Sequence, residues 1–69
     1  MATQIEIIGS DGTSIVRPIG AHLRTWEGIA YRRVSSDGTV GVQDQKADDA
    51  YEELSSGVID FGRVKIRVF

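Results

Sequence analysis

The 69-residue sequence predicts a single α+β domain spanning residues 1–69, in which a small antiparallel sheet packs on one amphipathic helix. Three observations predict this fold. Two Asp-Gly turns each lie between short strand-like runs, residues 44–58 repeat apolar side chains at helical spacing, and residues 63–69 alternate strictly. The predicted sheet has four to five strands, from two successive hairpins and a C-terminal strand, in the order β-β-β-β-α-β. A small half-open barrel built from the same elements is the alternative.

The first hairpin is predicted within residues 3–17. In residues 3–8, Ile5 and Ile7 alternate with polar neighbours, which is the period of a half-buried strand. The Asp-Gly pair within residues 9–13 suits a turn that needs positive φ, and residues 14–17 return as the second strand.

The second hairpin follows a segment, residues 21–27, that sustains no period and for which no element is predicted. Residues 28–34 are predicted as the third strand, residues 35–39 as the turn and residues 40–42 as the fourth strand. Both turns contain the tetrapeptide Ser-Asp-Gly-Thr. Convergence on one favourable turn chemistry explains this better than duplication, because Asp-Gly is a common hairpin signal and Ser and Thr flank turns for their own hydrogen bonds.

The helix is predicted to begin after Asp44, whose side chain can cap it, and to stop at Gly57. Asp48 and Asp49 fall in its first turns, where the helix dipole favours negative charge. The apolar positions that define its buried face have i, i+3, i+4 and i+7 spacing and are Ala47, Ala50, Tyr51, Leu54 and Val58.

The C-terminal strand is predicted from two interleaved sets of side chains. The apolar set is Val64, Ile66 and Val68, and the basic set is Arg63, Lys65 and Arg67. Successive side chains of a strand point to opposite faces, so the helix would cover the apolar set and the basic set would lie on the open face of the sheet.

Composition excludes several classes of protein. The chain has no Cys, so it has neither a disulfide framework nor a thiolate metal site. It has no apolar run near the roughly 18 residues that a membrane span needs and no basic leader, so we expect a cytoplasmic protein with no membrane partner. His22 is the only imidazole, and no spacing brings a nucleophile and an acid to it. We therefore expect no enzyme, no cofactor and no metal.

Charge is distributed unevenly along the chain. Residues 17–33 carry a net charge of +3, residues 44–60 carry −5 and residues 61–69 carry +3. The predicted partner-binding surface combines the open basic sheet face with one aromatic side chain: Tyr31, Arg32, Arg33, Arg63, Lys65 and Arg67. The predicted acidic face lies on the helix: Asp48, Asp49, Glu52 and Glu53.

These features favour a small non-enzymatic interaction module that binds a protein partner or forms a homodimer through charged surfaces. One alternative is single-stranded nucleic-acid binding, with phosphates on the basic face and a base stacked on Tyr31. Another is a small inhibitor from a phage or mobile element that presents the acidic helix to a basic protein surface.

Overall fold

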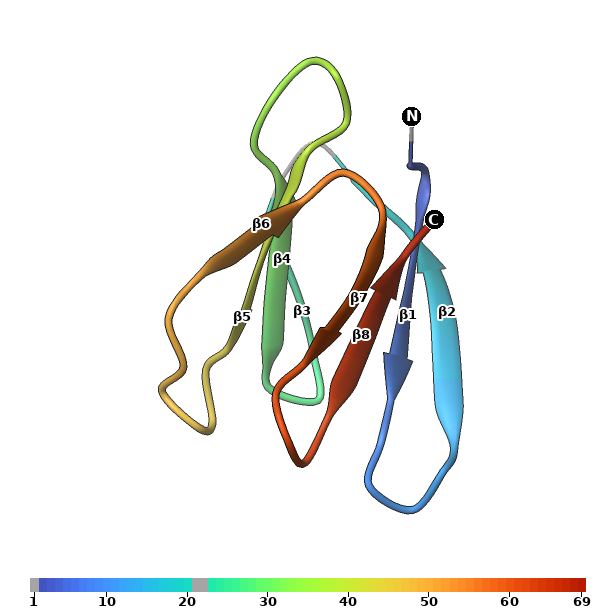
Figure 1. The fold of residues 1–69 in the computed structure, drawn as a ribbon, viewed down its shortest axis with the longest axis vertical. Coiled ribbons are helices and arrows are strands. Elements are labelled where there is room, and N and C mark those ends of the chain that lie inside the picture. The colour runs from blue at the N-terminus through green and yellow to red at the C-terminus, as the bar shows by residue number, and fades with distance from the viewer. Residues whose placement is uncertain (1, 21–22) are drawn as a thin grey trace.

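The computed structural model describes residues 2–20 and 23–69, and within them it contains eight strands and no helix (Figure 1). The strands are β1 (Gln4–Ile8), β2 (Ser14–Pro18), β3 (Arg24–Trp26), β4 (Ile29–Arg33), β5 (Val40–Asp44), β6 (Glu52–Leu54), β7 (Gly57–Asp60) and β8 (Lys65–Val68).

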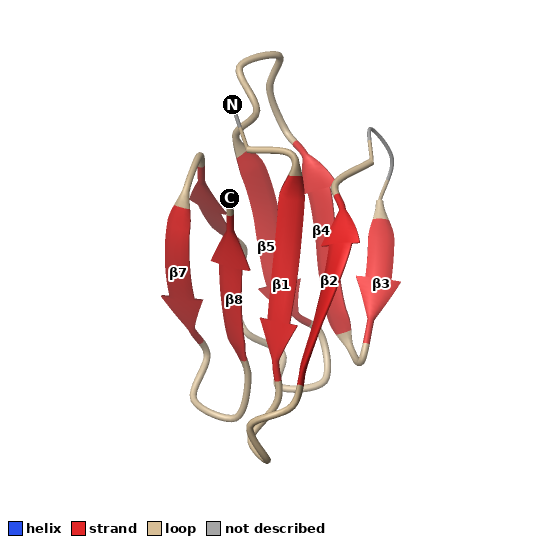
Figure 2. Ribbon diagram, turned by 90° about the vertical axis from the view of Figure 1, so that its right-hand side faces the viewer, coloured by secondary structure: helices blue, strands red, loops and turns tan. Residues whose placement is uncertain are grey.

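The strands form two four-stranded antiparallel sheets that pack face to face (Figure 2). Sheet A has the order β2-β1-β8-β7 and sheet B has the order β3-β4-β5-β6. The predicted α+β class is therefore wrong, because a second sheet takes the place of the helix as the cover of the apolar sheet face. The half-open barrel is not observed either, since the strands divide between two separate sheets.

The two predicted hairpins are both observed. β1 pairs with β2 around the first Ser-Asp-Gly-Thr turn, and β4 pairs with β5 around the second. In each turn the glycine adopts the left-handed conformation, with φ of 88° at Gly12 and 95° at Gly38, which a side chain at that position would disfavour.

The registers in sheet A run straight across all four strands. Ile15, Ile7, Ile66 and Ile59 share one row that faces sheet B. The neighbouring row, which faces solvent, contains Val16, Glu6, Arg67 and Val58. This regular alternation follows from the period of two in the sequences of β1 and β8.

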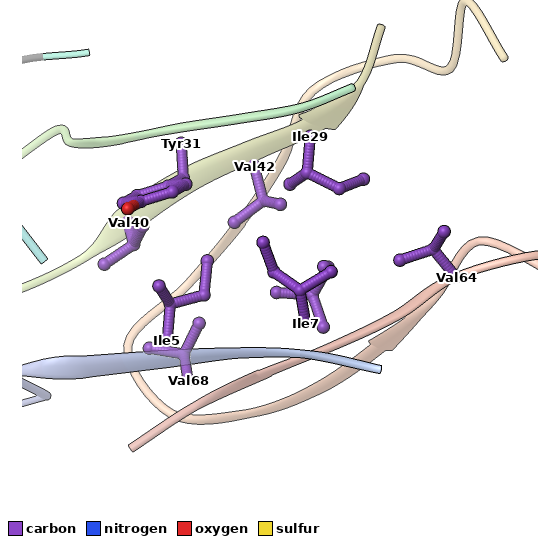
Figure 3. Close-up of a cluster of buried hydrophobic side chains, with 9 residues drawn as sticks. Ile5, Ile7, Ile29, Tyr31, Val40, Val42, Val64 and Val68 are labelled. Carbon is purple, nitrogen blue, oxygen red and sulfur yellow. The ribbon is translucent and has the colours of Figure 1, made fainter. Parts of the chain in front are cut away.

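The core lies between the two sheets (Figure 3). It is built from aliphatic side chains and one Tyr: Ile5, Ile7, Val64, Ile66 and Val68 from the sheet A side, and Ile29, Tyr31, Val40 and Val42 from sheet B. β-branched residues dominate this list because they pack well on a pleated surface.

The predicted helix is replaced by a turn and two strands. Asp44 does act as a cap, since its Oδ1 accepts a hydrogen bond from the Ala47 backbone N–H at 3.3 Å. The turn then closes at once: Asp48 adopts a φ of 57°, and the N–H of Asp49 donates to the carbonyl of Asp44 at 3.1 Å. Bonds of this kind around a left-handed residue terminate helices, so the start and stop signals are only one turn apart.

Candidate protein-binding face

The predicted basic surface is dispersed over the molecule. Lys65 and Arg67 lie on the solvent side of sheet A, as their alternation predicted. Arg32 lies on the opposite side of the sandwich, on the outer face of sheet B, where its guanidinium is 5.7 Å from the ring of Tyr51. Arg33 lies at the end of β4 and donates to the carbonyls of Ser35 and Ser36 at 3.3 and 3.2 Å.

Arg63 has a structural partner that the sequence did not indicate. Its Nη2 donates to Oδ1 of Asp44, whose side chain is completely buried, while 41% of the Arg63 side chain is exposed. The second carboxylate oxygen of Asp44 is buried and has no hydrogen-bond partner among the residues that the structure describes. Arg63 therefore neutralises an interior charge and is not available in the way that an unpaired surface cation is.

Tyr31 is buried among the core side chains, with 4% of its surface exposed (Figure 3). It points from β4 toward sheet A, whereas the next residue, Arg32, points to the opposite face of sheet B. A base cannot stack on a ring in this position, so the aromatic platform predicted for nucleic-acid binding is not formed.

The predicted acidic helix face does not exist, because its residues lie on a turn and a strand. Asp48 is exposed in the turn and Asp49 is half-buried beside it. Glu52 and Glu53 alternate on β6, opposite Val42 and Gly41 respectively, and so point to different sides of sheet B.

The outer face of sheet A, which we call face A, is the most distinctive open surface. Three of the five large apolar side chains that are exposed in the described residues belong to it: Val16, Val58 and Phe69, with exposures of 43%, 58% and 42%. Lys65 and Arg67 share this face, and neither a helix nor the other sheet covers it (Figure 2).

Face A also holds one of its cations in a fixed position. The Nε of Arg67 donates to Oε1 of Glu6 on the neighbouring strand at 3.0 Å, and its guanidinium lies 4.1 Å from the centre of the Phe69 ring. Lys65 lies opposite Asp60 and Ile8, yet forms no ion pair with any residue the structure describes. Face A therefore offers a preorganised arginine, an unpaired lysine and apolar contact area.

The outer face of sheet B is partly covered by its own chain. Tyr51 lies against Gly41, where an added Cβ would come within 3.1 Å of the Tyr51 ring and 3.0 Å of a Val34 methyl group. This packing leaves less of sheet B open to a partner than of sheet A.

A hollow of about 390 Å³ opens at the end of the sandwich that carries the β1–β2 turn. Trp26, Glu27, Arg63 and Asp11 are among its lining residues. The indole N–H of Trp26 is buried and finds no hydrogen-bond partner within the described part of the chain, and Arg17 stacks over the ring at 4.6 Å from its centre. In the same lining the hydroxyl of Thr13 donates a hydrogen bond to the Asp11 carboxylate at 2.7 Å, an exposed contact within the β1–β2 turn.

The exposed carboxylates of the two Ser-Asp-Gly-Thr turns are held by local hydrogen bonds. In the second turn, hydrogen bonds from the hydroxyl of Ser35 and from the backbone and hydroxyl of Thr39 lower the pKa of Asp37 to about 2. In the first, the hydroxyl and backbone N–H of Thr13 lower the pKa of Asp11. Both groups are ionised at neutral pH and act as turn-forming acceptors.

The described residues contain neither a metal-binding cluster nor a helix that could span a membrane. No group of three or more His, Cys, Asp or Glu residues within 2–20 and 23–69 is arranged to hold a metal ion. No helix in the same ranges is long and apolar enough to cross a membrane. His22 lies outside the described residues.

Comparison with known proteins adds no relative. No protein-family model, no curated protein and no solved structure matches the chain.

Sequence reasoning missed the Asp44–Arg63 pair and the apolar part of face A. The sequence did not indicate that Val16 and Val58 share a face, because Val16 was predicted in a short strand and Val58 in the helix. Only the register places them in one row with Arg67.

Proposed function

We propose that the chain is a non-enzymatic interaction module that binds another protein through face A. The observation that carries this proposal is the collection of Val16, Val58 and Phe69 around Lys65 and Arg67 on an uncovered sheet. Exposed apolar side chains that gather on one face of a monomer are typical of interaction surfaces.

The side chains of face A indicate what kind of protein surface would bind it. Val16, Val58 and Phe69 supply apolar contact area, and Arg67 loses little side-chain freedom on binding because Glu6 and Phe69 already hold it. Lys65 has no ion-pair partner in the described part of the chain and is available to an acidic group. A complementary surface therefore combines apolar side chains with a carboxylate positioned for Lys65.

The alternative of single-stranded nucleic-acid binding lacks the exposed Tyr31 ring and most of the cations on which it was based. Tyr31 is buried, Arg32 and Arg33 do not share a surface with Lys65 and Arg67, and Arg63 is paired with Asp44. The sequence pI of about 5.1 also opposes nonspecific attraction to phosphates. We keep this alternative only as an outcome of the experiment that tests the proposal.

The experiment compares tagged wild-type protein with two lysine variants in pull-downs from a lysate of the cells that encode the chain, with and without nuclease. Lys65→Glu reverses the unpaired cation of face A. Lys46→Glu makes the same charge change on an exposed residue of the β5–β6 turn and is the matched control. Circular dichroism spectra and melting temperatures verify that both variants are folded.

We expect a nuclease-resistant set of proteins to bind wild type and Lys46→Glu and to be lost with Lys65→Glu. Equal capture by Lys65→Glu and wild type would show that face A is not the binding surface. Capture that disappears with nuclease in every sample would instead favour the nucleic-acid alternative.

A further inference from the structure

In residues 2–20 and 23–69, both sheets end in strands whose outer edges pair with no other strand. Sheet A ends at β2 and β7, and sheet B ends at β3 and β6. The β2 and β3 edges lie together at one side of the sandwich (Figure 2), and at the other side a two-residue connection, 55–56, joins β6 to β7. Unpaired backbone N–H and C=O groups along such edges are able to pair with a further strand.

We propose that these two sides bind one another between copies of this chain, so that β7 of one copy pairs with β2 of the next and β6 pairs with β3. The proposal goes beyond the binding of a partner on face A, because it uses the sheet edges and names a second copy as the occupant.

Strand direction permits this association in both sheets at once. Neighbouring strands are antiparallel throughout, and each sheet has four strands, so its two edge strands run in opposite directions. A second copy placed alongside in the same orientation thus brings its β2 antiparallel to β7 and its β3 antiparallel to β6. In a sheet with an odd number of strands the two edge strands would run in the same direction, and the two copies would meet through parallel strands.

The register of sheet A is suited to such a continuation. In the β1–β2 ladder the bonds from Gly9 N–H to the Thr13 carbonyl and from Ile19 N–H to the Thr3 carbonyl fix the phase, so Ser14 and Val16 direct their backbone groups outward. In the β7–β8 ladder the bond from Phe61 N–H to the Val64 carbonyl fixes the alternation of bonded and non-bonded pairs. The backbone N–H and C=O of Val58 therefore point away from β8, toward the free edge.

Because the rows run straight across sheet A, Val58 of one copy falls beside Val16 of the next. By the same registers Ile59 falls beside Ile15 on the inner side, and both isoleucines are half-buried in the single chain. The association would therefore extend the apolar rows of both faces of sheet A.

The register of sheet B agrees with this placement. Arg24, Tyr31, Val42 and Glu52 form one row across its four strands. The bond from Val34 N–H to the Thr39 carbonyl fixes the phase of the β4–β5 ladder. By alternation, Thr25 and Glu53 then direct their backbone groups to the free edges of β3 and β6.

The charges at the two sides are complementary. Continuing the row places Glu52 of one copy beside Arg24 of the next, and neither residue has an ion-pair partner among the residues described. Asp49, Glu52 and Asp60 line a hollow of about 250 Å³ on the β6 and β7 side. The β2 and β3 side instead carries Arg17 and Arg24.

Like charges on each side also oppose the pairing of two identical edges. A β3 edge meeting another β3 edge would bring arginines together, and a β6 edge meeting another β6 edge would bring glutamates together. Charged edge residues normally protect a sheet from association, but here the opposite signs leave one pairing favourable. Such a head-to-tail contact generates rings or open filaments, in which each copy advances the assembly by about 19 Å, or four strands at about 4.8 Å.

Charge reversal across the predicted contact tests the proposal by sedimentation velocity over a range of concentrations. Arg24→Glu and Glu52→Arg each place like charges opposite one another, so each variant alone should associate at least about tenfold more weakly than wild type. In an equimolar mixture the two variants alternate, and every contact regains an opposite pair. Within one chain these residues lie on opposite edges of the same four-strand row, so recovery on mixing cannot arise within a monomer.

We expect wild type and the mixture to form species larger than a dimer at low salt, and each single variant to remain smaller. A wild-type chain that stays monomeric up to millimolar concentration would overturn the proposal. Association that is unchanged in both single variants would overturn it equally. Lys65→Glu should associate as wild type does, which separates a failure of this proposal from a failure of partner binding on face A.

Discussion

Two ion pairs of this molecule use the same chemical groups in different environments. Asp44 and Arg63 meet at the end of the sandwich, where the carboxylate is completely buried. Glu6 and Arg67 meet on face A, where 18% of the Glu6 side chain and 47% of the Arg67 side chain are exposed. Both arginines belong to the alternating C-terminal segment, so their sequence context does not distinguish them.

The difference between the pairs shows that burial of the acid decides what the arginine does. A buried carboxylate without a counter-charge is very unfavourable, so Arg63 is required by the fold. An exposed pair contributes little to stability, because water and salt screen it, so Arg67 is available for contact with a partner. Arg63 therefore has a structural role, and Arg67 remains a candidate for contact with a partner.

The largest expected effect is that of removing the counter-charge of Asp44. Arg63→Met should lower the free energy of unfolding by about 3 kcal/mol, at the lower end of the range for broken buried pairs because Arg63 is partly exposed. A chain of this length has a total stability of only about 3–10 kcal/mol, so the melting temperature should fall steeply. Urea denaturation measures the change.

If Arg63→Met does not fold, Arg63→Lys provides a milder version, since it keeps the charge and loses the planar guanidinium. A stability of Arg63→Met within 0.5 kcal/mol of wild type, on the order expected for an ordinary surface substitution, would contradict the importance of the buried pair.

Removing the buried charge together with its partner should be less harmful than removing the partner alone. In Asp44→Asn/Arg63→Met the neutral side chain at position 44 can still accept the hydrogen bond from Ala47. We expect the double variant to recover about 1–3 kcal/mol relative to Arg63→Met. A double-mutant cycle with urea denaturation measures this coupling, and additive losses would argue against it.

The exposed pair should respond weakly. Glu6→Gln removes the charge that faces Arg67 and should cost about 0.2–1 kcal/mol, with the difference from wild type shrinking as salt is added. The melting temperature at low and high salt is the appropriate measurement. A loss as large as that of Arg63→Met would remove the contrast between the two pairs.

Local signals in the sequence predicted the β1–β2 and β4–β5 hairpins and the last strand, because these elements depend on short-range chemistry. The Asp-Gly turns at Gly12 and Gly38 and the alternation of Val64, Ile66 and Val68 were sufficient. The segment after Asp44 was predicted wrongly, because the cap and the helical spacing were genuine while the left-handed Asp48 was not detectable. Non-glycine residues adopt that conformation only occasionally, and tertiary packing selects it.

The binding face was predictable only in part, because it depends on register between distant strands. Lys65 and Arg67 were assigned to an open face correctly, since alternation alone fixes their side of the strand. Arg32 and Tyr31 were assigned to the same face wrongly. Tyr31 and Arg32 are consecutive on β4 and therefore point to opposite faces, and no local pattern indicated that a second sheet would bury Tyr31.

The smallest expected effect concerns a carboxylate that has hydrogen bonds but no ion pair with any described residue. Folding lowers the pKa of Asp37 from 3.8 to about 2, chiefly through the Ser35 hydroxyl. A lowered pKa stabilises the folded chain above pH 4, about the pKa of an unfolded aspartate, and that contribution is lost as the pH falls toward 2. Asp37→Asn should therefore flatten part of the decline in melting temperature between pH 4 and pH 2.

Asp11 is the matched control for this effect, because its turn has the same tetrapeptide but Gly9 in the place of Ser35. Hydrogen bonds from Thr13 lower the pKa of Asp11 without the additional hydroxyl that acts on Asp37. Asp11→Asn should alter the acid side of the melting profile less than Asp37→Asn does. If the two variants alter it equally, the serine hydroxyl does not set the difference between the two turns.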